Sequence, residues 1–282
     1  MPELPEVEVL VRHLEPLLQN KTIRAVTVRR ARVLAPTSPR TLRRILRGAK
    51  FMSLSRRGKH LLFTLRGKTG RLPIPLLGHL GMTGRMYLAR KNVPLPKHAA
   101  VVLDLGGENF IYEDPRYFGR LTLDISRVAR LGPEPLSAAF TVPALVSALR
   151  RSRQAIKVKL LDQAMVAGIG NIYASEALFR ARISPKRAAA RLSPAQIVRL
   201  RQAIRAVLRE AIACGSTLPL NFGGGRDGLF YFGRATGTVD YYAERLRVYD
   251  RAGRPCVVCG TPIKRLVQAA RSTFYCPQCQ RR

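Results

Sequence analysis

The chain has 282 residues, of which 46% are apolar, and this length and composition predict a folded protein with more than one domain. Lysine and arginine number 50 against 17 acidic residues, so the formal net charge is +33. Such a surplus predicts a polyanionic partner, with nucleic acid as the leading candidate. A codon bias towards arginine would explain a preference for arginine over lysine, but not the surplus of positive charge.

Two features argue against a membrane or secreted protein. No stretch reaches the roughly 18 uninterrupted apolar residues of a membrane span, and residues 1–13 contain prolines and glutamates instead of a basic and then apolar leader. Four of the five cysteines form two closely spaced pairs, which suits a metal site in a reducing compartment better than a disulfide framework. We therefore expect an intracellular protein.

The first half of the chain is typical of a β-rich domain. Residues 4–18 carry apolar side chains every three or four positions, which predicts an amphipathic helix. Short stretches that alternate or run apolar then follow, separated by Gly or Pro. Residues 131–143 are rich in proline and predict a linker, so the first domain is expected over residues 2–130. The predicted strands are 22–29, 51–55, 60–65, 85–88, 100–105 and 110–112.

Helices are predicted to dominate after the linker. Ser193-Pro194-Ala195-Gln196 is a capping box with proline at the first helical position, and an apolar stripe follows it as far as Gly215. The opposite face of this helix carries Arg201, Arg205 and Arg209, which we expect to be solvated. Cys214 closes the helix and is expected to be a small buried residue.

The stretch 221–242 differs in character, since it is rich in glycine and aromatic residues and lacks aliphatic periodicity. This composition predicts a mobile loop. We expect it to belong to a helical domain over residues 131–244, followed by a last domain over residues 245–282.

The last domain carries the strongest motif in the chain. Two C-x2-C pairs are separated by sixteen residues, a spacing that lets two tight turns present four thiolates to one zinc ion. A closed shell of four thiolates is structural, because it leaves zinc no open position for catalysis. Lys264, Arg265 and Arg271 lie between the pairs, where the metal would make the chain rigid. The predicted ligands are Cys256, Cys259, Cys276 and Cys279.

The N-terminus offers a candidate nucleophile. A small second residue normally allows Met1 to be removed, which would leave Pro2 as a free secondary amine. Because an α-amino group has a pKa of roughly 7.7–8.0, about a tenth of it is neutral at pH 7 and can attack an aldehyde-like sugar carbon. Glu3 and Glu6 would then be a candidate acid and base. Proline and glutamate are also ordinary residues of a first helical turn, so this pattern alone leaves both interpretations open.

Six further motifs decide between these interpretations. In the order of the chain, they resemble the motifs of formamidopyrimidine-DNA glycosylase from residue 2 to residue 280. They are Pro2-Glu3-Leu4-Pro5-Glu6-Val7-Glu8, Arg56-Arg57-Gly58-Lys59, His79-Leu80-Gly81-Met82, Asp114-Pro115-Arg116, the run from Gly168 to Glu176, and Arg271-Ser272-Thr273-Phe274-Tyr275-Cys276.

The resemblance implies an α+β multidomain fold with an N-terminal β-sandwich flanked by helices, a helical domain with a helix–two-turn–helix motif, and a C-terminal zinc finger with one structural zinc ion. It implies a monomeric bacterial enzyme of the cytoplasm, working on nucleoid DNA, with no membrane partner. Its substrate would be double-stranded DNA with oxidised purines (8-oxoguanine, formamidopyrimidines) or abasic sites. The enzyme would flip and excise the base through an iminium intermediate on Pro2 and then break the strand by β,δ-elimination.

Individual roles follow from the matched motif positions. Pro2 matches the nucleophile, Glu3 the proton donor to the sugar, and Glu6 a supporting carboxylate. Met82 and Phe118 match residues that fill the vacated stack together with an arginine, although by composition alone both would be core residues. The resemblance assigns catalysis to Pro2, Glu3, Glu6, Lys59 and Arg271, and DNA contact to His98, Arg116, Lys157, Asn171, Met82 and Phe118. For Lys157, a solvated helix charge is the alternative.

Four departures from the family bear on the choice of lesion. Tyr117 replaces a second arginine, Ala99-Ala100 replace Asp-His, and Ala269-Ala270 replace Gly-Gln. The loop 221–242 is also longer than is typical by about ten residues, and in the family it closes over the flipped base. Two alternatives therefore stay open: the same chemistry on oxidised pyrimidines, as in the related endonuclease VIII group, and a non-catalytic zinc-finger protein that binds damaged DNA.

Overall fold

The computed structural model describes residues 2–68, 70, 72–215 and 245–281, and its contacts divide the chain into two compact units. Among these residues, the first unit contains Pro2 and residues 6–129, and the second contains the remainder. The predicted loop 221–242 lies outside the described residues. The three domains expected from the sequence stay a prediction.

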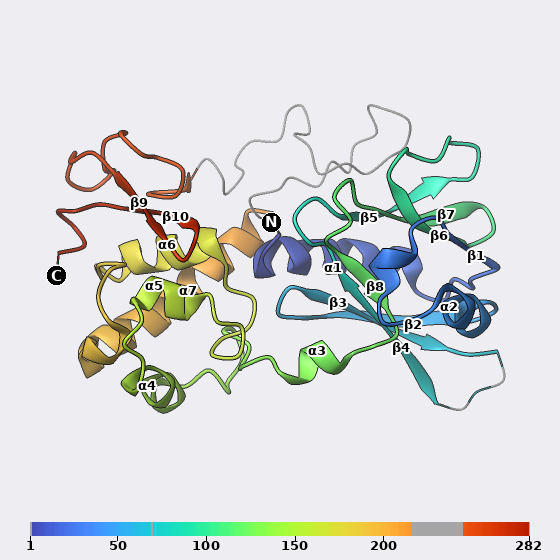
Figure 1. Cartoon of the computed structure of the whole chain (residues 1–282), viewed down its shortest axis with the longest axis horizontal. Helices are drawn as coiled ribbons and strands as arrows, with labels where there is room; N and C mark the ends of the chain where they lie inside the picture. Colours follow the sequence, from blue (N-terminus) through green and yellow to red (C-terminus); the bar gives the residue numbers. More distant parts are fainter. Residues whose placement is uncertain (1, 69, 71, 216–244, 282) are drawn as a thin grey trace. The chain divides into compact units, whose positions relative to one another are not determined.

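The first unit is a β-sandwich of two antiparallel four-stranded sheets, as the sequence led us to expect (Figure 1). Phe51 and Phe63 of one sheet pack against Phe110 of the other, with ring centroids 6.4 and 5.7 Å apart, so aromatic side chains fill the centre of the core. One sheet has the order β1 (Ala25–Val28), β6 (Ala99–Asp104), β7 (Glu108–Glu113), β5 (Arg85–Arg90), and the other β2 (Lys50–Arg57), β3 (His60–Arg66), β4 (Pro73–His79), β8 (Arg120–Thr122).

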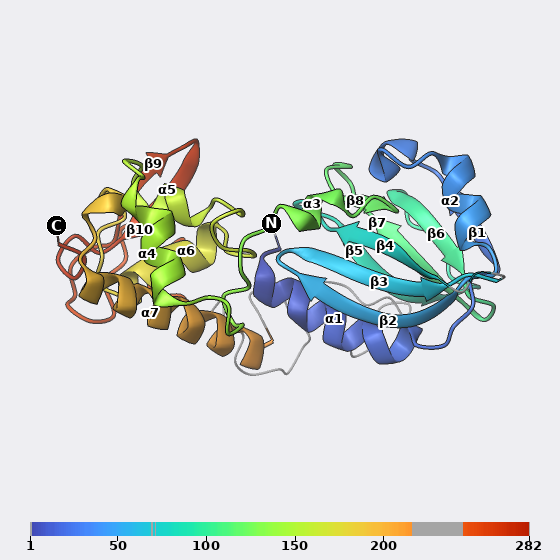
Figure 2. The same cartoon turned by 90° about the horizontal axis from the view of Figure 1, so that it is seen from below.

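Helices flank this sandwich. Helix α1 (Leu4–Leu18) has the predicted bounds and contributes Val7, Leu14 and other apolar side chains to the sandwich core. It runs along the sandwich, and α2 (Pro39–Leu46) lies at the end of this unit away from the N-terminus (Figure 2). The short elements η1 (Ala31–Leu34) and α3 (Ser126–Ala129) complete the unit.

Strands β4 and β8 were missed by the sequence analysis. Pro73 and Pro75 argue against a central strand because proline donates no ladder hydrogen bond. Both residues pair with β3, whereas β8 pairs only with residues 77–79, so the prolines occupy an edge of the sheet where no donor is needed. Strand β8 has only three residues, too few for a periodic pattern to be recognised.

The second unit is helical and carries a hairpin. Apolar faces of its helices form one core around α6, and α5 and α6 are joined by two turns, which confirms the helix–two-turn–helix expectation. No helix among the described residues is long and apolar enough to cross a membrane. The elements are α4 (Val142–Arg150), α5 (Ile156–Leu160), α6 (Asn171–Arg180), η2 (Ala189–Arg191), α7 (Pro194–Ala213), β9 (Lys264–Gln268) and β10 (Arg271–Tyr275).

Helix α7 confirms the capping box and corrects the expectation for its arginine face. The Ser193 hydroxyl accepts from the Gln196 backbone N–H, and the Gln196 side chain accepts in return from that of Ser193. Arg201 donates to the Phe140 carbonyl at 2.6 Å, and Arg205 donates to carbonyls of residues 135 and 137. These two arginines satisfy carbonyls of an irregular segment, which sequence periodicity cannot reveal. Cys214 ends the helix but is only half-buried, contrary to expectation.

The turn of the β9–β10 hairpin is strained. Gln268 pairs with Arg271, so Ala269 and Ala270 form a two-residue turn, and their φ angles are 47° and 58°. Both angles lie in the left-handed region, which costs an L-residue roughly 1–2 kcal/mol. A two-residue turn with both φ angles positive is of type I′, in which Asn-Gly is preferred. Here two alanines, which disfavour a positive φ, occupy these positions.

Replacing Ala270 by glycine should stabilise this hairpin. Relief of the positive φ outweighs the entropy that glycine adds to the unfolded chain, which leaves a net gain of about 0.5–1 kcal/mol. Slower loss of zinc to a chelator and a higher midpoint of finger unfolding would show the gain. Val267→Gly is the matched control, because Val267 is an exposed strand residue and the change should weaken the finger. Equal effects of the two substitutions would contradict the strain argument.

Candidate active site

The residues at the start of the chain are fixed by hydrogen bonds to α6. The buried carboxylate of Glu3 accepts the backbone N–H of Gly170 at 2.6 Å and that of Ile172 at 3.0 Å. Gly170 is the N-cap of α6, so the carboxylate pairs with helix donors that have no partner within the helix, and it faces the positive end of the dipole. Glu3 is therefore held in one place, with Pro2 as its covalent neighbour.

Gly168 allows this approach. Its φ is +86°, and a Cβ at this position would come within 2.7 Å of the Leu4 side chain. The Leu4 N–H also donates to the Gly168 carbonyl at 3.0 Å. A larger residue at 168 would force Leu4 away and pull Glu3 from the helix.

Three polar side chains converge at the same end of α6. The Asn171 side-chain amide donates to the Ser272 carbonyl at 2.9 Å, which joins α6 to β10. Lys157 of α5 is buried, and its ammonium donates to the Asn171 side-chain oxygen and, at 3.4 Å, to the same Ser272 carbonyl. Arg271 is exposed at the residue before Ser272. The structure therefore brings four predicted site residues of the second unit together: Glu3, Lys157, Asn171 and Arg271.

Lys157 is not the solvated helix charge that remained an alternative. Burial, followed by repulsion from Arg271, lowers the pKa of Lys157 to about 8, and attraction to Glu3 opposes the shift only in part. At neutral pH the ammonium is largely protonated and adds positive charge beneath Asn171. Such a buried cation beside an exposed arginine suits an anion.

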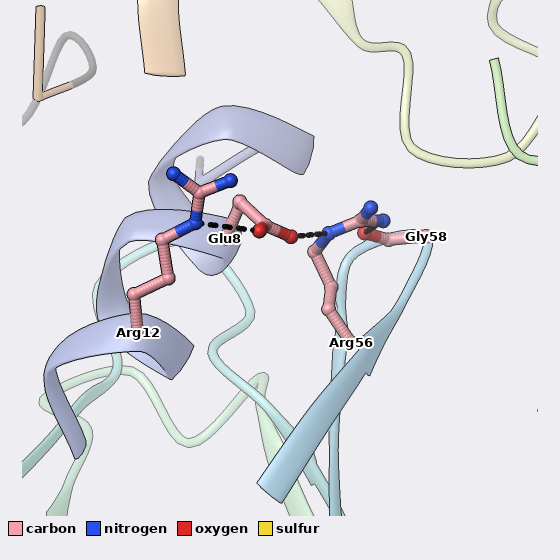
Figure 3. Close-up of polar contacts among 4 residues, drawn as sticks. All are labelled: Glu8, Arg12, Arg56 and Gly58. Carbon is pink, nitrogen blue, oxygen red and sulfur yellow. Dashed lines mark hydrogen bonds and ion pairs between the residues drawn. The ribbon is translucent and has the colours of Figure 1, made fainter. Parts of the chain in front are cut away.

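In the first unit, a network of ion pairs holds the turn that carries the predicted site residue Lys59. Glu8 on α1 accepts from Arg12 and from Arg56, each at 2.8 Å, and Arg56 also donates to the Gly58 carbonyl at 3.1 Å (Figure 3). Burial opposes the charged form of Glu8, yet these hydrogen bonds hold its pKa below the usual value. Gly58 precedes Lys59 in the β2–β3 turn, so the network fixes that turn against α1.

Pro2, Glu6 and Lys59 are all buried in the structure. Burial of the polar ends of Glu6 and Lys59 is costly unless each has polar partners, so these two positions are unusual for purely structural residues.

The three residues assigned to the vacated stack lie on two loops tied to one carboxylate. Asp114 is buried and accepts from the Thr83 hydroxyl at 2.8 Å, and it also accepts from the backbone N–H groups of residues 116 and 119. Met82 and Phe118 are 47% and 53% exposed, so they are not the core residues that composition would suggest. The Arg116 guanidinium lies over the Phe118 ring at 5.7 Å.

Tyr117, which replaces the family's second arginine, has a left-handed backbone with φ 54°. Its hydroxyl accepts from the Arg30 guanidinium at 3.1 Å, and its ring meets the His98 ring edge-on at 6.4 Å. Ala99 and Ala100 are buried at the start of β6. Arg30 therefore supplies a guanidinium beside the position where the family carries one.

The four predicted zinc ligands form one cluster. Their sulfur atoms all lie within 4.8 Å of one another, with separations that include 3.5 and 3.9 Å. Tetrahedral zinc with bonds of about 2.3 Å requires sulfurs about 3.8 Å apart, so the thiolates fit the ion. Zinc would cross-link the two turns, leaving no ligand position open for chemistry. The ligand residues are Cys256, Cys259, Cys276 and Cys279.

Two further carboxylates organise the site but were not singled out in the sequence. Asp114 was read only as part of a motif, and Glu176 was read only as the end of another. Glu176 is buried and accepts three backbone N–H groups, those of residues 247, 248 and 249, which attaches the start of the last segment to α6. Glu176 is the single charged residue of the run 172–179, and a carboxylate in such an apolar run predicts a buried group with polar partners, whereas no comparable signal marks Asp114.

Comparisons with known proteins agree with this arrangement. Three family models match: the formamidopyrimidine-DNA glycosylase N-terminal domain over residues 1–121, its H2TH domain over 131–220, and the zinc finger found in FPG and IleRS over 253–282. The formamidopyrimidine-DNA glycosylase of Symbiobacterium thermophilum is 43% identical, over 99% of this chain and 89% of its own length. The formamidopyrimidine-DNA glycosylase of Thermus thermophilus is 42% identical over 99% of this chain and 98% of its own length.

Solved structures give the same result. The crystal structure of MutM (FPG) from Thermus thermophilus has a TM-score of 0.82 at 40% identity and covers 99% of this chain and 98% of its own. A Lactococcus lactis FPG mutant in complex with Fapy-dG DNA has a TM-score of 0.87 at 32% identity, with full coverage of both chains. MutM in complex with DNA containing carbocyclic 8-oxo-G has a TM-score of 0.86 at 31% identity, also with full coverage of both chains.

A β-sandwich, a helix–two-turn–helix unit and a four-cysteine finger define a zinc-containing DNA repair glycosylase. Relatives that are more than 40% identical over 99% of this chain identify the family within that class. The chain belongs to the formamidopyrimidine-DNA glycosylase family of bacterial enzymes, which are bifunctional DNA glycosylases and AP lyases. The non-catalytic alternative is thereby excluded.

Replacing Cys256 by serine should remove zinc and unfold the finger alone. Four-thiolate sites bind zinc with about 10–16 kcal/mol that also folds the domain, so loss of one ligand forfeits several kcal/mol of finger stability. Zinc content by atomic absorption, with proteolysis of the finger, measures the effect. Cys214→Ser, outside the cluster, should keep its zinc. Loss of the β-sandwich together with the finger would contradict this separation.

Lys157 should make stability depend on pH. In the folded chain Lys157 deprotonates near pH 8, whereas in the unfolded chain it keeps its proton up to about 10.4. Between these values the unfolded chain binds more protons, so the free energy of unfolding should rise with pH by up to about 1.4 kcal/mol per unit. Urea melts at each pH give the free energy of unfolding of the original chain and of Lys157→Met. The difference between the two isolates the pH dependence that is due to Lys157. A difference that is constant from pH 7 to 10 would contradict the assignment.

Proposed function

We propose that the chain excises oxidised purines, 8-oxoguanine and formamidopyrimidines, from duplex DNA, with Pro2 as the nucleophile once Met1 is removed. The reacting DNA would be the damaged duplex that relatives bind in their solved complexes. Work on the nucleoid in the bacterial cytoplasm suits the four thiolates, which need a reducing compartment. One observation supports the proposal above all: two hydrogen bonds hold the Glu3 carboxylate on α6, directly after Pro2 in the chain.

The proton transfers can be written around Glu3. Attack of the neutral Pro2 nitrogen on C1′ forms a C–N bond as the bond to the damaged base breaks, and the base takes its proton from solvent. Glu3 accepts hydrogen bonds in the free protein, so we assign it first as the acceptor of the Pro2 N–H proton. It then gives this proton to the sugar ring oxygen, which opens the ring and leaves an iminium on Pro2.

The iminium makes strand cleavage possible. It withdraws electrons from C2′, so a C2′ proton is lost and the bond to the 3′ phosphate breaks, and δ-elimination then releases the 5′ phosphate. Glu6 and Lys59 are proposed as the supporting carboxylate and ammonium. Each elimination returns its proton to solvent or to a nearby carboxylate, and water releases the product from Pro2.

The DNA would be held by its backbone and by the gap left in the stack. Asn171, Lys157 and Arg271 converge in one place and are proposed to bind the phosphates flanking the flipped nucleotide. We assign His98 to DNA contact as well. The exposed Met82 and Phe118, with Arg116, are proposed to fill the vacated space.

Borohydride trapping on an abasic duplex tests the proposed roles. Protein with Pro2 at its N-terminus, verified by mass spectrometry, should form a covalent adduct, and protein that retains Met1 should form none. Glu3→Gln should slow trapping about 10²–10⁴-fold, because it removes a proton acceptor. Glu15→Gln is the control, since Glu15 is an exposed carboxylate of α1, the helix that begins directly after Glu3. Trapping that is independent of Met1 removal would rule out Pro2.

Excision rates on three matched duplexes test the lesion preference. We expect 8-oxoguanine and formamidopyrimidine to be removed at least tenfold faster than an oxidised pyrimidine. The reverse order would support the endonuclease VIII-like alternative while leaving the nucleophile assignment intact.

A further inference from the structure

Helix α2 and its C-cap residue, Arg47, carry a face of four arginines that the proposed catalytic site does not use. Arg40, Arg43, Arg44 and Arg47 are all exposed, while Leu42 and Leu46 on the other side are buried in the sandwich core. At 100° per residue, the four arginines fall within a stripe of about 100° that extends about 10 Å along the axis. Lys68, also exposed, lies against Gly48 just beyond the helix. We call these five residues the α2 basic face.

Nothing acidic in the surrounding sequence balances this face. Between Glu15 and Asp104 the chain contains no aspartate or glutamate. Among the described residues of the first unit, Glu8, Asp104 and Glu108 form ion pairs with residues outside α2. In the part of the chain that the structure describes, no carboxylate forms an ion pair with these four arginines.

The arginines of this face repel one another. The four arginines make like-charge pairs at i,i+3 and i,i+4, each of which destabilises a helix by about 0.2–0.5 kcal/mol. The helix dipole disfavours Arg40 in the first turn and favours Arg43 and Arg44 in the last, so it does not remove the repulsion among them. By contrast, α1 pairs Arg12 with Glu8, and Arg201 and Arg205 of α7 donate to carbonyls. The repulsion in α2 suits a surface that an anion covers.

This face is remote from the N-terminus within its own unit. Helix α1 is about 22 Å long, and α2 lies beyond its C-terminal end (Figures 1 and 2). A duplex held at Pro2 would leave the arginines of α2 available.

We propose that the α2 basic face is a second DNA site, which binds the phosphate backbone of another duplex segment while the catalytic site is occupied. Duplex DNA carries one negative charge per about 1.7 Å of axis, so a 10 Å row of arginines meets several phosphates. The face has no aromatic residue, and binding of single strands commonly relies on aromatic stacking. Contact with two segments would let the enzyme pass between neighbouring stretches of DNA without full release.

A trapped complex tests this without interference from the catalytic site. Borohydride first links Pro2 to a short abasic duplex, and the yield on a gel reports that chemistry separately. A second, labelled, undamaged duplex is then titrated, with binding measured by fluorescence anisotropy. We expect binding whose affinity falls about 150-fold between 50 and 200 mM salt, as four neutralised phosphates imply. A trapped complex that does not bind the second duplex would overturn the proposal.

Arg43→Glu with Arg44→Glu separates binding from folding. The new carboxylates can pair with Arg40 and Arg47, so the helix should be at least as stable, while binding of the second duplex should fall at least tenfold. Arg199→Glu with Arg209→Glu is the matched control, because it changes two exposed arginines of α7 by the same charge. Equal losses in the two double variants would show a general charge effect, and unchanged binding in the α2 variant would place the site elsewhere. Either result would refute the proposal, as would tighter binding of a single strand than of a duplex.

Discussion

The first turn of α6 has backbone N–H groups that find no acceptor inside the helix, and the Glu3 carboxylate accepts two of them. The position of the chain's N-terminus depends on this interaction. Without a buried acceptor at Glu3, the Leu4 side chain would lose its place against Gly168 and the residue before Glu3 would be free to move. A carboxylate that caps a helix is held in one place, so the same hydrogen bonds would fix the geometry of the proposed proton transfers.

The same helix end gathers groups from distant parts of the sequence. Lys157 on α5, Asn171 on α6 and Ser272 on β10 share hydrogen bonds, and Glu176 on the next turns of α6 holds residues 247–249. The finger is therefore attached to α6 at two points. Zinc keeps the hairpin folded, but the bonds to α6 determine where Arg271 lies.

Local patterns in the sequence predicted the elements that local physics controls. The bounds of α1, the capping box of α7 and the four-cysteine cluster follow from periodicity, cap chemistry and ligand spacing. Strand β4 could not be predicted, because whether its prolines are tolerated depends on where β8 ends. The roles of Arg201 and Asp114 depend equally on segments brought near by the fold.

For the candidate site, the sequence predicted the residues better than their surroundings. Motif resemblance named Lys157 and Asn171, but only the fold shows that one is buried beneath the other. Tyr117 could be noted as a departure, yet its contact with Arg30 joins residues that are far apart in the chain. Such pairings arise from strand order, which a single sequence does not encode in any short pattern.

The Asp114 carboxylate has a consequence for how undamaged DNA is searched. By bonding to Thr83 and to two N–H groups of the 116–119 turn, it holds Met82 and Phe118 half-exposed before any DNA arrives. The conformational entropy of these two loops is then lost once, during folding, and not when DNA binds. If Met82 and Phe118 fill the stack as proposed, loops that are already in place could test one base pair after another without rearranging.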